Sequence, residues 1–378
     1  MDLKEIRSKI DNIDDEILQL YLKRMALSKE VGVYKSQNDI AVNDNKRERE
    51  IVYRLTQKCD ESMRLYVKEL YDMIFSTSKA YQLGFINKSS ELKSELEVLV
   101  NEISEFPIEG TIACQGVEGA NSQTAAEKLF SISSIMYFKN FDGVFNAVEK
   151  GLCKYGVLPI ENSTAGSVLE VYDLMKKHNF HIVKSIRVAI DHVLAVKKGT
   201  KASQIKTILS HSQALLQCKD FINSLGAEAR AVENTAIGAK MVSEGDDSSV
   251  AVLCSKDCAN IYGLEIIKEK VQNSEKNYTR FICISKDLKI YSGADKVSIM
   301  TSLAHTPGSL YKLVSRFYAY GLNLTKIESR PIEGSDFEFM FYFDFEGNIL
   351  DEQVRNLISE LESGSDNFKL LGIYKENL

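Results

Sequence analysis

Residues 155–166, YGVLPIENSTAG, form a short apolar run that ends in polar and glycine-containing turn residues. The same texture recurs along the middle of the chain, in HIVKSI (181–186), HVLAV (192–196), KTILSH (206–211) and SVAVLCS (249–255). Stretches with helical spacing lie between these runs. Short strands that alternate with helices are typical of an α/β fold. We therefore predict an α/β region over residues 110–286.

After this region the chain changes to a second pattern. A strand at 296–305 is followed by a helix at 307–320, strands at 324–332 and 337–345, a helix from about 350 and a strand at 368–375. This β-α-β-β-α-β order is that of the α+β ferredoxin-like fold, which we predict for residues 294–378. The strand FEFMFYFDF alternates phenylalanines, and one apolar face of this kind is enough to cover two helices. These phenylalanines are Phe337, Phe339, Phe341, Phe343 and Phe345.

The amino-terminal residues 1–87 carry an all-α pattern of three helices instead. Residues 1–86 contain no proline and only two glycines, Gly32 and Gly84. Asp2 and Glu5 form a capping-box-like start, and apolar residues then follow in alternating steps of three and four. The apolar seam consists of Leu3, Ile6, Ile10, Ile13, Ile17, Leu20, Leu27, Val31 and Tyr34.

The length of the first helix has a consequence for assembly. A helix of about 34 residues is about 50 Å long, which is longer than a three-helix unit can cover by itself. We expect a partner chain to cover the rest, in an intertwined homodimer or a higher homo-oligomer. A second helix is predicted from Asn43 or Asp44 and a third over residues 61–82. Residues 88–109 are predicted to be a polar helix or linker.

The composition limits the classes of function. At 378 residues the chain is long enough for two or three domains. Its net charge of −6 argues against nucleic acid as a partner, and no apolar run approaches the ~18 residues of a membrane span, so we expect a cytoplasmic protein. The seven cysteines are scattered, without a second Cys or His pair at metal spacing. We expect reduced thiols, no cofactor and no metal.

Polar residues interrupt the helical faces at related positions. Arg24 occupies the skipped position of the apolar seam, and Lys35 lies about three turns further along nearly the same face. An arginine in an apolar seam is costly unless it is paired or binds a ligand. Arg7 is 17 residues, or about 25 Å, from Arg24. Both can therefore hold one small molecule only if Arg7 comes from the other subunit.

The full set of polar positions resembles the all-helical chorismate mutase domain over nearly all of residues 1–85. The set comprises Arg7, Arg24, Lys35, Asp44, Arg47, Glu48, Ser78 and Gln82. The resemblance implies a Claisen rearrangement, which needs a folded dianion and stabilisation of charge on the ether oxygen rather than a nucleophile. It implies catalytic donation to that oxygen by Lys35 and Gln82, and binding of carboxylates by the arginines. A coiled-coil dimerisation module with solvated charges is the alternative.

Four segments of residues 111–285 resemble prephenate dehydratase and the related arogenate dehydratase. They are GVLPIENSTAG (156–166), IDHVLAV (190–196), LSHSQALLQC (209–218) and NYTRF (277–281). The resemblance implies two α/β lobes like those of a periplasmic binding protein, with residues 187–263 as the second lobe and the ligand between them. It implies that Thr279 donates a hydrogen bond to the hydroxyl that leaves prephenate. Substrate-positioning roles are implied for Asn162, Ser163, Ser210, Gln213, Gln217 and Ser122.

One segment departs from the dehydratase pattern. Where that family usually has G-P-x-G-[ST]-[FY], this chain reads GVEGAN at 116–121. Glu118 adds a negative charge close to the expected position of an anionic ligand. Ser122 and Thr124 remain available to cap the helix that follows.

Two C-terminal segments, TPGSLY (306–311) and ESRP (328–331), resemble the phenylalanine-binding segments of an ACT regulatory domain. The resemblance implies feedback inhibition by L-phenylalanine bound at a dimer interface. Pro307 and Gly308 would open a helix whose free N–H groups receive the carboxylate of the amino acid. The rest of the site would be formed by Ser309, Leu310, Glu328, Ser329, Arg330 and Pro331. A purely structural domain is the alternative.

Together these segments resemble the bifunctional chorismate mutase/prephenate dehydratase family, with chorismate, prephenate and L-phenylalanine as ligands. That family implies conversion of chorismate to prephenate, and of prephenate to phenylpyruvate, CO2 and water, in L-phenylalanine biosynthesis. Three alternatives stay open: one activity only, arogenate as the dehydratase substrate, or a non-catalytic amino-acid sensor whose helices only dimerise. Thr279 is also compatible with an ordinary strand position, and His192 and His211 are candidate bases or structural residues.

Overall fold

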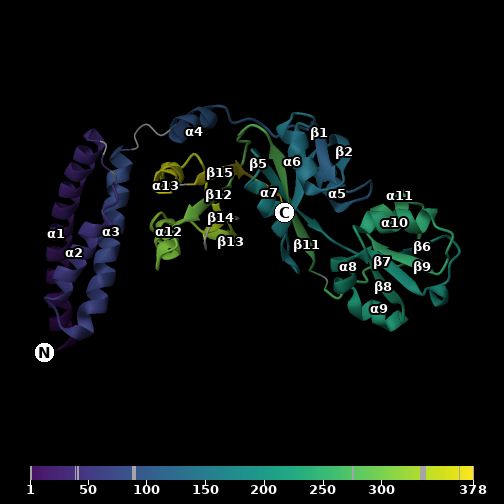
Figure 1. Cartoon of the computed structure of the whole chain (residues 1–378), viewed down its shortest axis with the longest axis horizontal. Coiled ribbons are helices and arrows are strands. Elements are labelled where there is room, and N and C mark those ends of the chain that lie inside the picture. Colours follow the sequence, from purple (N-terminus) through teal and green to yellow (C-terminus); the bar gives the residue numbers. More distant parts are fainter. Residues whose placement is uncertain are drawn as a thin grey trace.

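The structure is a computed structural model that describes residues 2–38, 40, 42–86, 91–274, 276–332, 338–365 and 367–377. In Figure 1 a helical unit stands at the left, the C-terminal unit in the middle and a two-lobed unit at the right. The unit that comes last in the sequence therefore lies between the other two in space. Phe337 lies outside the described residues. Within them, none of the helices is long and apolar enough to span a membrane.

The helical unit confirms the predicted elements. It consists of α1 (Leu3–Gln37), α2 (Asn45–Thr56), the 3-10 turn η1 (Glu61–Met63) and α3 (Arg64–Ile86). The Asp2 side chain accepts from the Glu5 N–H, and the Glu5 side chain accepts from the Asp2 N–H. The start of α1 is thus a full capping box, which satisfies two backbone donors that the helix leaves free.

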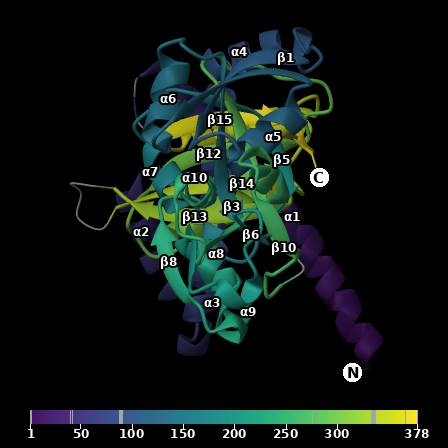
Figure 2. The same cartoon turned by 90° about the vertical axis from the view of Figure 1, so that its right-hand side faces the viewer.

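All nine members of the apolar seam of α1 are exposed, and the helix packs through another face, on which Ser28 and Gly32 are buried. Toward its carboxyl end α1 packs along α3, where the Tyr21 hydroxyl donates to Thr77 Oγ1 at 2.9 Å. Toward the amino end, Leu3, Ile17 and Leu20 keep 63%, 56% and 65% of their surface exposed. Figure 2 shows this end of α1 projecting beyond the rest of the chain. A long exposed apolar stripe of this kind marks an interaction surface.

The segment predicted to be a polar helix or linker contains α4 (Glu91–Asn101). Leu96 on α4 is completely buried, in one cluster with Leu357 and Ile358 of α13 (Glu352–Ser363). The helix is therefore a packed element of the C-terminal unit. The prediction included a helix here but missed its buried face.

The strands of the first lobe form one end of a large sheet. Its strands are β1 (Glu109–Gln115), β2 (Ile132–Phe138), β3 (Tyr155–Asn162), β4 (Gly166–Ser167), β5 (His181–Ala189) and β11 (Tyr278–Ser285). Its helices are α5 (Asn121–Leu129), α6 (Phe141–Glu149) and α7 (Leu169–Met175). Strand β11 returns from the second lobe and pairs antiparallel with both β3 and β5.

The second lobe has its own five-stranded sheet, in the order β10-β6-β9-β7-β8. The strands are β6 (Val193–Val196), β7 (Thr207–His211), β8 (Glu228–Val232), β9 (Val250–Cys254) and β10 (Glu265–Lys268). The helices are η2 (Ala202–Gln204), α8 (Ser212–Gln217), α9 (Lys219–Leu225), α10 (Thr235–Glu244) and α11 (Lys256–Ile261). This lobe starts later than the predicted residue 187, because β5 continues to Ala189 in order to pair with Tyr278.

The C-terminal unit has the predicted β-α-β-β-α-β order. It consists of β12 (Lys296–Leu303), α12 (Ser309–Ala319), β13 (Leu324–Pro331), β14 (Phe339–Glu346), α13, β15 (Phe368–Tyr374) and the short β16 (Glu376–Asn377). Phe343 and Phe345 are completely buried in the cluster that includes residues of α12 and α13. Met340 and Tyr342, on the opposite face of β14, are also buried, and the Tyr342 hydroxyl donates to the Tyr172 carbonyl of the first lobe at 2.7 Å.

The sheets of the C-terminal unit and the first lobe are continuous, in the order β13-β14-β12-β15-β5-β11-β3-β1-β2. At the junction Gly372 of β15 pairs with Ile182 of β5, and a Cβ at position 372 would lie 2.0 Å from the Ile182 carbonyl oxygen. Buried charges reinforce the junction. Arg280 contacts Asp344 at 2.5 Å and Glu376 at 2.9 Å. A sheet shared in this way ties the two units together by main-chain hydrogen bonds as well as by packing.

Candidate active sites

A cavity of about 290 Å³ lies among α1, α2 and α3. Seven of the eight residues predicted for the mutase site line it, namely Arg24, Lys35, Asp44, Arg47, Glu48, Ser78 and Gln82. Arg7 does not, because it lies on the exposed amino-terminal half of α1. The sequence spacing already placed Arg7 about 25 Å from Arg24.

Two cations of this cavity are held by neutral groups. The Arg24 guanidinium donates to Ser78 Oγ and lies over the Phe75 ring, with 5.6 Å between Cζ and the ring centre. Lys35 Nζ donates to the Val42 carbonyl at 2.8 Å. In the described part of the chain neither cation is paired with a carboxylate. Their positive charge is therefore available to an anion that enters the cavity.

Gln82 is held in place by close packing between α1 and α3. A Cβ at Gly32 would lie 3.1 Å from Gln82 Cγ, so the glycine near the carboxyl end of α1 permits this approach. Gln82 is 8% exposed, and its Oε1 has no hydrogen-bond partner among the described residues. An unsatisfied buried amide oxygen costs free energy. The side chain is thus positioned for a ligand that can complete its hydrogen bonds.

The acidic residues of the cavity have local partners that the sequence did not show. Asp44 is the N-cap of α2, where its carboxylate accepts from the Arg47 N–H at 2.9 Å. Glu48 pairs with Lys79 at 2.9 Å. Lys79 also lines the cavity and was not among the predicted residues, although it follows Ser78 directly. These contacts position the helix start and the carboxylates without using Arg24 or Lys35.

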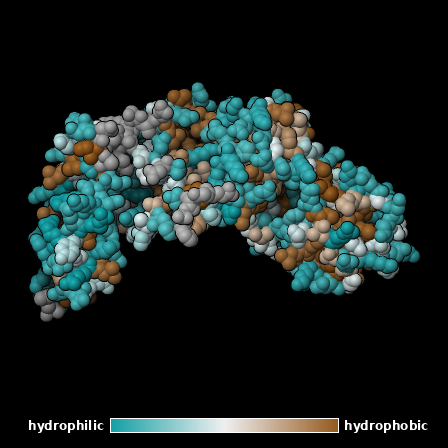
Figure 3. Space-filling view, in the orientation of Figure 1, coloured by the Kyte–Doolittle hydropathy of each residue, from teal (hydrophilic) through white to brown (hydrophobic). Residues whose placement is uncertain are grey.

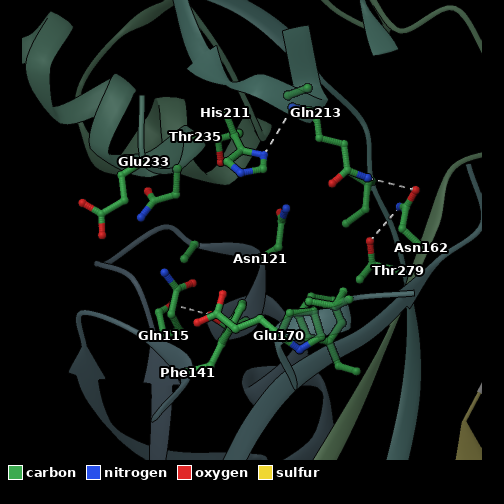
Figure 4. Close-up of a pocket in the computed structure, with 18 of the residues that line it drawn as sticks. Gln115, Asn121, Phe141, Asn162, Glu170, His211, Gln213, Glu233, Thr235 and Thr279 are labelled. Atoms are coloured by element: carbon green, nitrogen blue, oxygen red, sulfur yellow. Dashed lines mark hydrogen bonds between the residues drawn. The ribbon is translucent and has the colours of Figure 1, made fainter. Parts of the chain in front are cut away.

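A second cavity, of about 480 Å³, lies in the cleft between the two lobes. It is lined by five of the predicted dehydratase residues, namely Ser122, Asn162, Gln213, Gln217 and Thr279. Figure 4 shows side chains of both lobes facing this space. Lining residues that were not predicted for the site include Gln115, Asn121, Lys139, Phe141, Glu170, Glu233, Thr235 and Phe281.

Asn162, at the end of β3, is the centre of the hydrogen-bond network in this cleft. Its Nδ2 donates to Asn277 Oδ1 at 2.8 Å and to Thr279 Oγ1 at 3.0 Å. Its Oδ1 accepts from the N–H groups of Thr164 and Ala165 at 3.0 and 2.9 Å. Asn162 is 7% exposed. Its amide is therefore occupied by the protein and fixes the turn and the Thr279 hydroxyl.

Thr279 presents its hydroxyl at the cleft. It pairs with Asn162 across β11 and β3 and with Val188 across β11 and β5. Because Oγ1 accepts from Asn162, the hydroxyl proton remains free to be donated to a ligand. The same arrangement is shown in Figure 4, where the Asn162 and Thr279 side chains meet.

Gln217 and Gln213 extend this network from α8. Gln217 Oε1 accepts from Asn277 Nδ2 at 3.1 Å and lies 3.1 Å from His192 Nε2. Both glutamines approach Asn162 Oδ1 at 3.4 Å. Helix α8 of the second lobe is thereby hydrogen-bonded to Asn162 of the first lobe.

The hydroxyl groups of three predicted site residues form hydrogen bonds with the protein. Ser210 is completely buried and donates to the Leu253 carbonyl at 2.7 Å, away from the cleft. Ser163 accepts from the Tyr278 N–H at 2.9 Å and does not line the cleft. Ser122 lines the cleft, but its hydroxyl donates to the Gln115 carbonyl at 2.8 Å.

The atypical GVEGAN segment contributes one residue to the cleft. The N-cap of α5 is Ala120, so neither Ser122 nor Thr124 caps this helix as predicted. Asn121 lines the cleft, whereas Glu118 does not: it is exposed, and its carbonyl accepts from the Tyr262 hydroxyl at 3.0 Å. Glu118 therefore adds no negative charge to the lining of the described cleft.

Both histidines of the cleft have a lowered pKa because burial disfavours the charged imidazolium. For His192 a hydrogen bond from the ring to Gln217 opposes this effect, but desolvation is the larger cause. Both rings are consequently neutral at pH 7. A neutral His192 that is 3% exposed and bonded to Gln217 supports the structural interpretation of this residue.

The predicted L-phenylalanine residues lie on different surfaces. Gly308 has φ +83° and precedes α12, where Thr306 Oγ1 and Ser309 Oγ are 2.7 Å apart. On β13, Glu328 accepts from the Ser167 hydroxyl, and Arg330 holds Asp173 through two contacts of 2.9 and 2.7 Å. These two side chains face the first lobe. Ser329 and Pro331 are exposed and alternate with them along the strand.

Comparisons with known proteins cover both cavities. Family models for chorismate mutase type II and prephenate dehydratase match residues 6–83 and 112–289. The bifunctional chorismate mutase/prephenate dehydratase of Aquifex aeolicus (strain VF5) is 32% identical over 100% of this chain and 99% of its own. Arogenate dehydratase/prephenate dehydratase 2, chloroplastic, of Arabidopsis thaliana is 37% identical over 72% of this chain and 76% of its own. A prephenate dehydratase from Arthrobacter aurescens, solved in complex with L-Phe, has TM-score 0.65 and 27% identity over 70% of this chain and 89% of its own.

Proposed function

The chain belongs to the family of bifunctional chorismate mutase/prephenate dehydratases, and we propose that its two cavities catalyse the two successive reactions. Chorismate is rearranged to prephenate in the helical cavity, and prephenate is converted to phenylpyruvate in the cleft between the lobes. We assign residues 1–87 to the mutase, 88–109 to the linker, 110–286 to the dehydratase and 294–378 to a regulatory domain.

The observation that carries the mutase assignment is the pair of cations without carboxylate partners, beside the buried Gln82. A Claisen rearrangement proceeds within one molecule, so the site has to hold the dianion folded and stabilise the charge that grows on the ether oxygen. Arg24 binds a carboxylate, while Lys35 Nζ and Gln82 Nε2 donate to the ether oxygen. A coiled-coil that only dimerises has no need for such a cavity.

The mutase site is completed by a second chain. Chorismate has two carboxylates. Arg24 and Arg47 both line the cavity, but Arg47 is largely exposed and contacts Glu50 at 3.5 Å. Arg7 lies on the exposed half of α1, where the apolar seam also lacks cover. Association of two α1 helices along this seam buries the apolar residues and brings Arg7 of one chain to the cavity of the other.

In the dehydratase reaction the bond between the ring and its carboxylate breaks, and its electron pair enters the ring as CO2 leaves. The C–O bond at the opposite end of the ring breaks at the same time, and the departing hydroxide becomes water with one proton. Thr279 donates a hydrogen bond to this hydroxyl, because Asn162 already occupies the acceptor side of Oγ1. Aromatisation drives the step, so a well-placed donor is enough.

The C-terminal unit is an ACT domain that senses L-phenylalanine. Support comes from its β-α-β-β-α-β order, from the TPGSLY and ESRP segments, and from the relative that was solved with L-Phe. In this assignment the start of α12 and the exposed Ser329 and Pro331 of β13 form the ligand side. Glu328 and Arg330 hold the domain on the first lobe.

The two reactions are separable by mutation because their residues lie in different units. Lys35→Ala is expected to lower the mutase rate by about 10²- to 10³-fold, the usual effect of losing one oriented donor, and to spare turnover of added prephenate. Thr279→Ala is expected to do the reverse. The measurement follows prephenate and phenylpyruvate formed from chorismate by purified protein, with Lys23→Ala, an exposed lysine of α1, as control.

Loss of both activities in either variant, with an unchanged circular dichroism spectrum, would contradict the assignment. Wild-type protein that forms prephenate but never phenylpyruvate would show that only the mutase is retained.

Arogenate is a second candidate substrate for the cleft. It carries an ammonium group on its side chain, and two carboxylates, those of Glu170 and Glu233, line the cleft. A relative with 37% identity is named for both substrates. The ratio of kcat/KM for arogenate and prephenate decides between them.

A further inference from the structure

The cleft has an unfavourable charge balance for its substrate. Prephenate carries two carboxylates, yet the cleft contains the carboxylates of Glu170 and Glu233 and two histidines that are neutral at pH 7. Among the lining residues that the structure describes, Lys139 supplies the one side chain with a permanent positive charge. A dianion that binds in this cleft therefore depends strongly on Lys139.

The backbone of Lys139 forms a hydrogen bond, whereas its ammonium group has no ion-pair partner in the described part of the chain. It lies between the end of β2 and the start of α6, where its carbonyl accepts from Gln115 Nε2 at 3.4 Å. The next residue, Asn140, caps α6 by accepting from the Gly143 N–H at 2.9 Å. In the described part of the chain Lys139 forms no ion pair, neither with Glu170 nor with Glu233. The backbone at this position is thus fixed by hydrogen bonds, and the ammonium group is available to a ligand.

The sheet places Lys139 at the opposite end of the cleft from Thr279. Strand β2 is separated from β11 by β3 and β1, so the two strands lie three spacings apart, or about 14 Å. In prephenate the leaving hydroxyl is at one end of the ring and both carboxylates are at the other. With the hydroxyl at Thr279, the carboxylates point toward Lys139.

We propose that Lys139 is a substrate-binding residue that holds the carboxylate of the pyruvyl side chain. This proposal rests on the proposed dehydratase function. The chemistry selects this carboxylate, because it is retained in the product. The ring carboxylate leaves as CO2, and a cation bound to it would stabilise the reactant more than the transition state.

The variant Lys139→Gln tests this role, with Lys128→Gln as matched control. Lys128 is exposed in the last turn of α5, in the same lobe, and does not line the cleft. For Lys139→Gln we expect KM for prephenate to rise about 10- to 100-fold, the usual effect of losing a charged hydrogen bond. We expect kcat to change by less than about threefold, since binding to a retained group is equal in reactant and transition state. Lys139→Arg keeps the charge and is expected to restore most of the lost affinity.

Phenylpyruvate identifies which carboxylate is bound, because the product retains the side-chain carboxylate and has lost the one on the ring. Its inhibition constant is expected to rise in parallel with KM in Lys139→Gln. An unchanged inhibition constant would overturn the assignment to the side-chain carboxylate. A KM within about twofold of the Lys128→Gln value, with active wild-type protein, would overturn the role of Lys139 altogether. Wild-type protein without dehydratase activity would instead refute the proposed function itself.

Discussion

At the scale of single residues, the cleft contains side chains whose polar atoms are already bonded to the protein and side chains whose polar atoms are not. Asn162 was predicted to position the substrate, but its amide is used by Thr279, Asn277 and the turn at 164–165. A motif shows which residues occur together, not which of them has a free donor. Ser210 illustrates the same point, because its hydroxyl is bonded to the Leu253 carbonyl. Lys139 is the opposite case: it belongs to no motif, yet it lines the cleft and has no ion-pair partner among the described residues.

Gly372 provides a residue-scale prediction. A Cβ there would lie 2.0 Å from the Ile182 carbonyl oxygen, which is backbone and cannot rotate away. Gly372→Ala is therefore expected to lower the free energy of unfolding by about 1–3 kcal/mol, as other overpacking substitutions do. Urea denaturation measures this loss, and Gly364→Ala, where the nearest atom is at 3.2 Å, is the control. Equal stability of the two variants would show that the junction opens easily.

At the scale of elements, the local patterns predicted helices and strands but not every surface that covers them. The capping box of α1 and the β-α-β-β-α-β order depend on residues close in sequence, and both were predicted. The burial of Met340 and Tyr342 was not predicted, because the residues that cover them belong to the first lobe, including its helix α7, and are distant in sequence. Leu96 of α4 was missed for the same reason. A polar composition does not exclude one buried residue per turn.

Helix α12 gives the element-scale prediction. Gly308→Ala with Ser309→Val is expected to relieve inhibition of the dehydratase by L-phenylalanine and to leave its uninhibited rate largely intact. Gly308 has φ +83°, so part of any effect is backbone strain of about 1–2 kcal/mol. Gly321→Ala at the other end of α12, with φ +67° and open space around it, introduces the same strain away from the site.

Calorimetry with L-phenylalanine measures the binding, with L-tyrosine as the comparison ligand. Absence of phenylalanine binding to the wild type, equal inhibition by tyrosine, or equal relief in the Gly321→Ala control would refute the sensing site.

At the scale of the whole molecule, the C-terminal unit is in contact with both catalytic units. Its helix α13 packs against α3 of the helical unit, and its sheet continues into the first lobe. A cavity at the first contact is lined by Ser309 of α12 and by Val42 and Lys79, and the last two also line the mutase cavity. A ligand at the start of α12 would therefore be close to residues of the mutase site.

Subunit exchange gives the whole-molecule prediction. An Arg7→Ala chain mixed in equal amounts with a Lys35→Ala chain forms half heterodimers, and each heterodimer has one intact site of two. The mutase activity is therefore expected to recover to about one quarter of the wild-type value, as two-fold symmetry requires. Activity is measured after mixed dimers have been verified by mass spectrometry. No recovery in verified heterodimers would mean that each site is built within one chain.

The buried charges behind Thr279 bear on whether the dehydratase could stand as a free enzyme. The residue after Thr279 is Arg280, which is 7% exposed and depends on Asp344 and Glu376 of the C-terminal unit for its counter-charges. Removing that unit would take away both counter-charges of Arg280 and would uncover the edge of β5. The residue next to Thr279 therefore depends on the C-terminal unit for its counter-charges, so a dehydratase unit without that domain would need another way to stabilise Arg280.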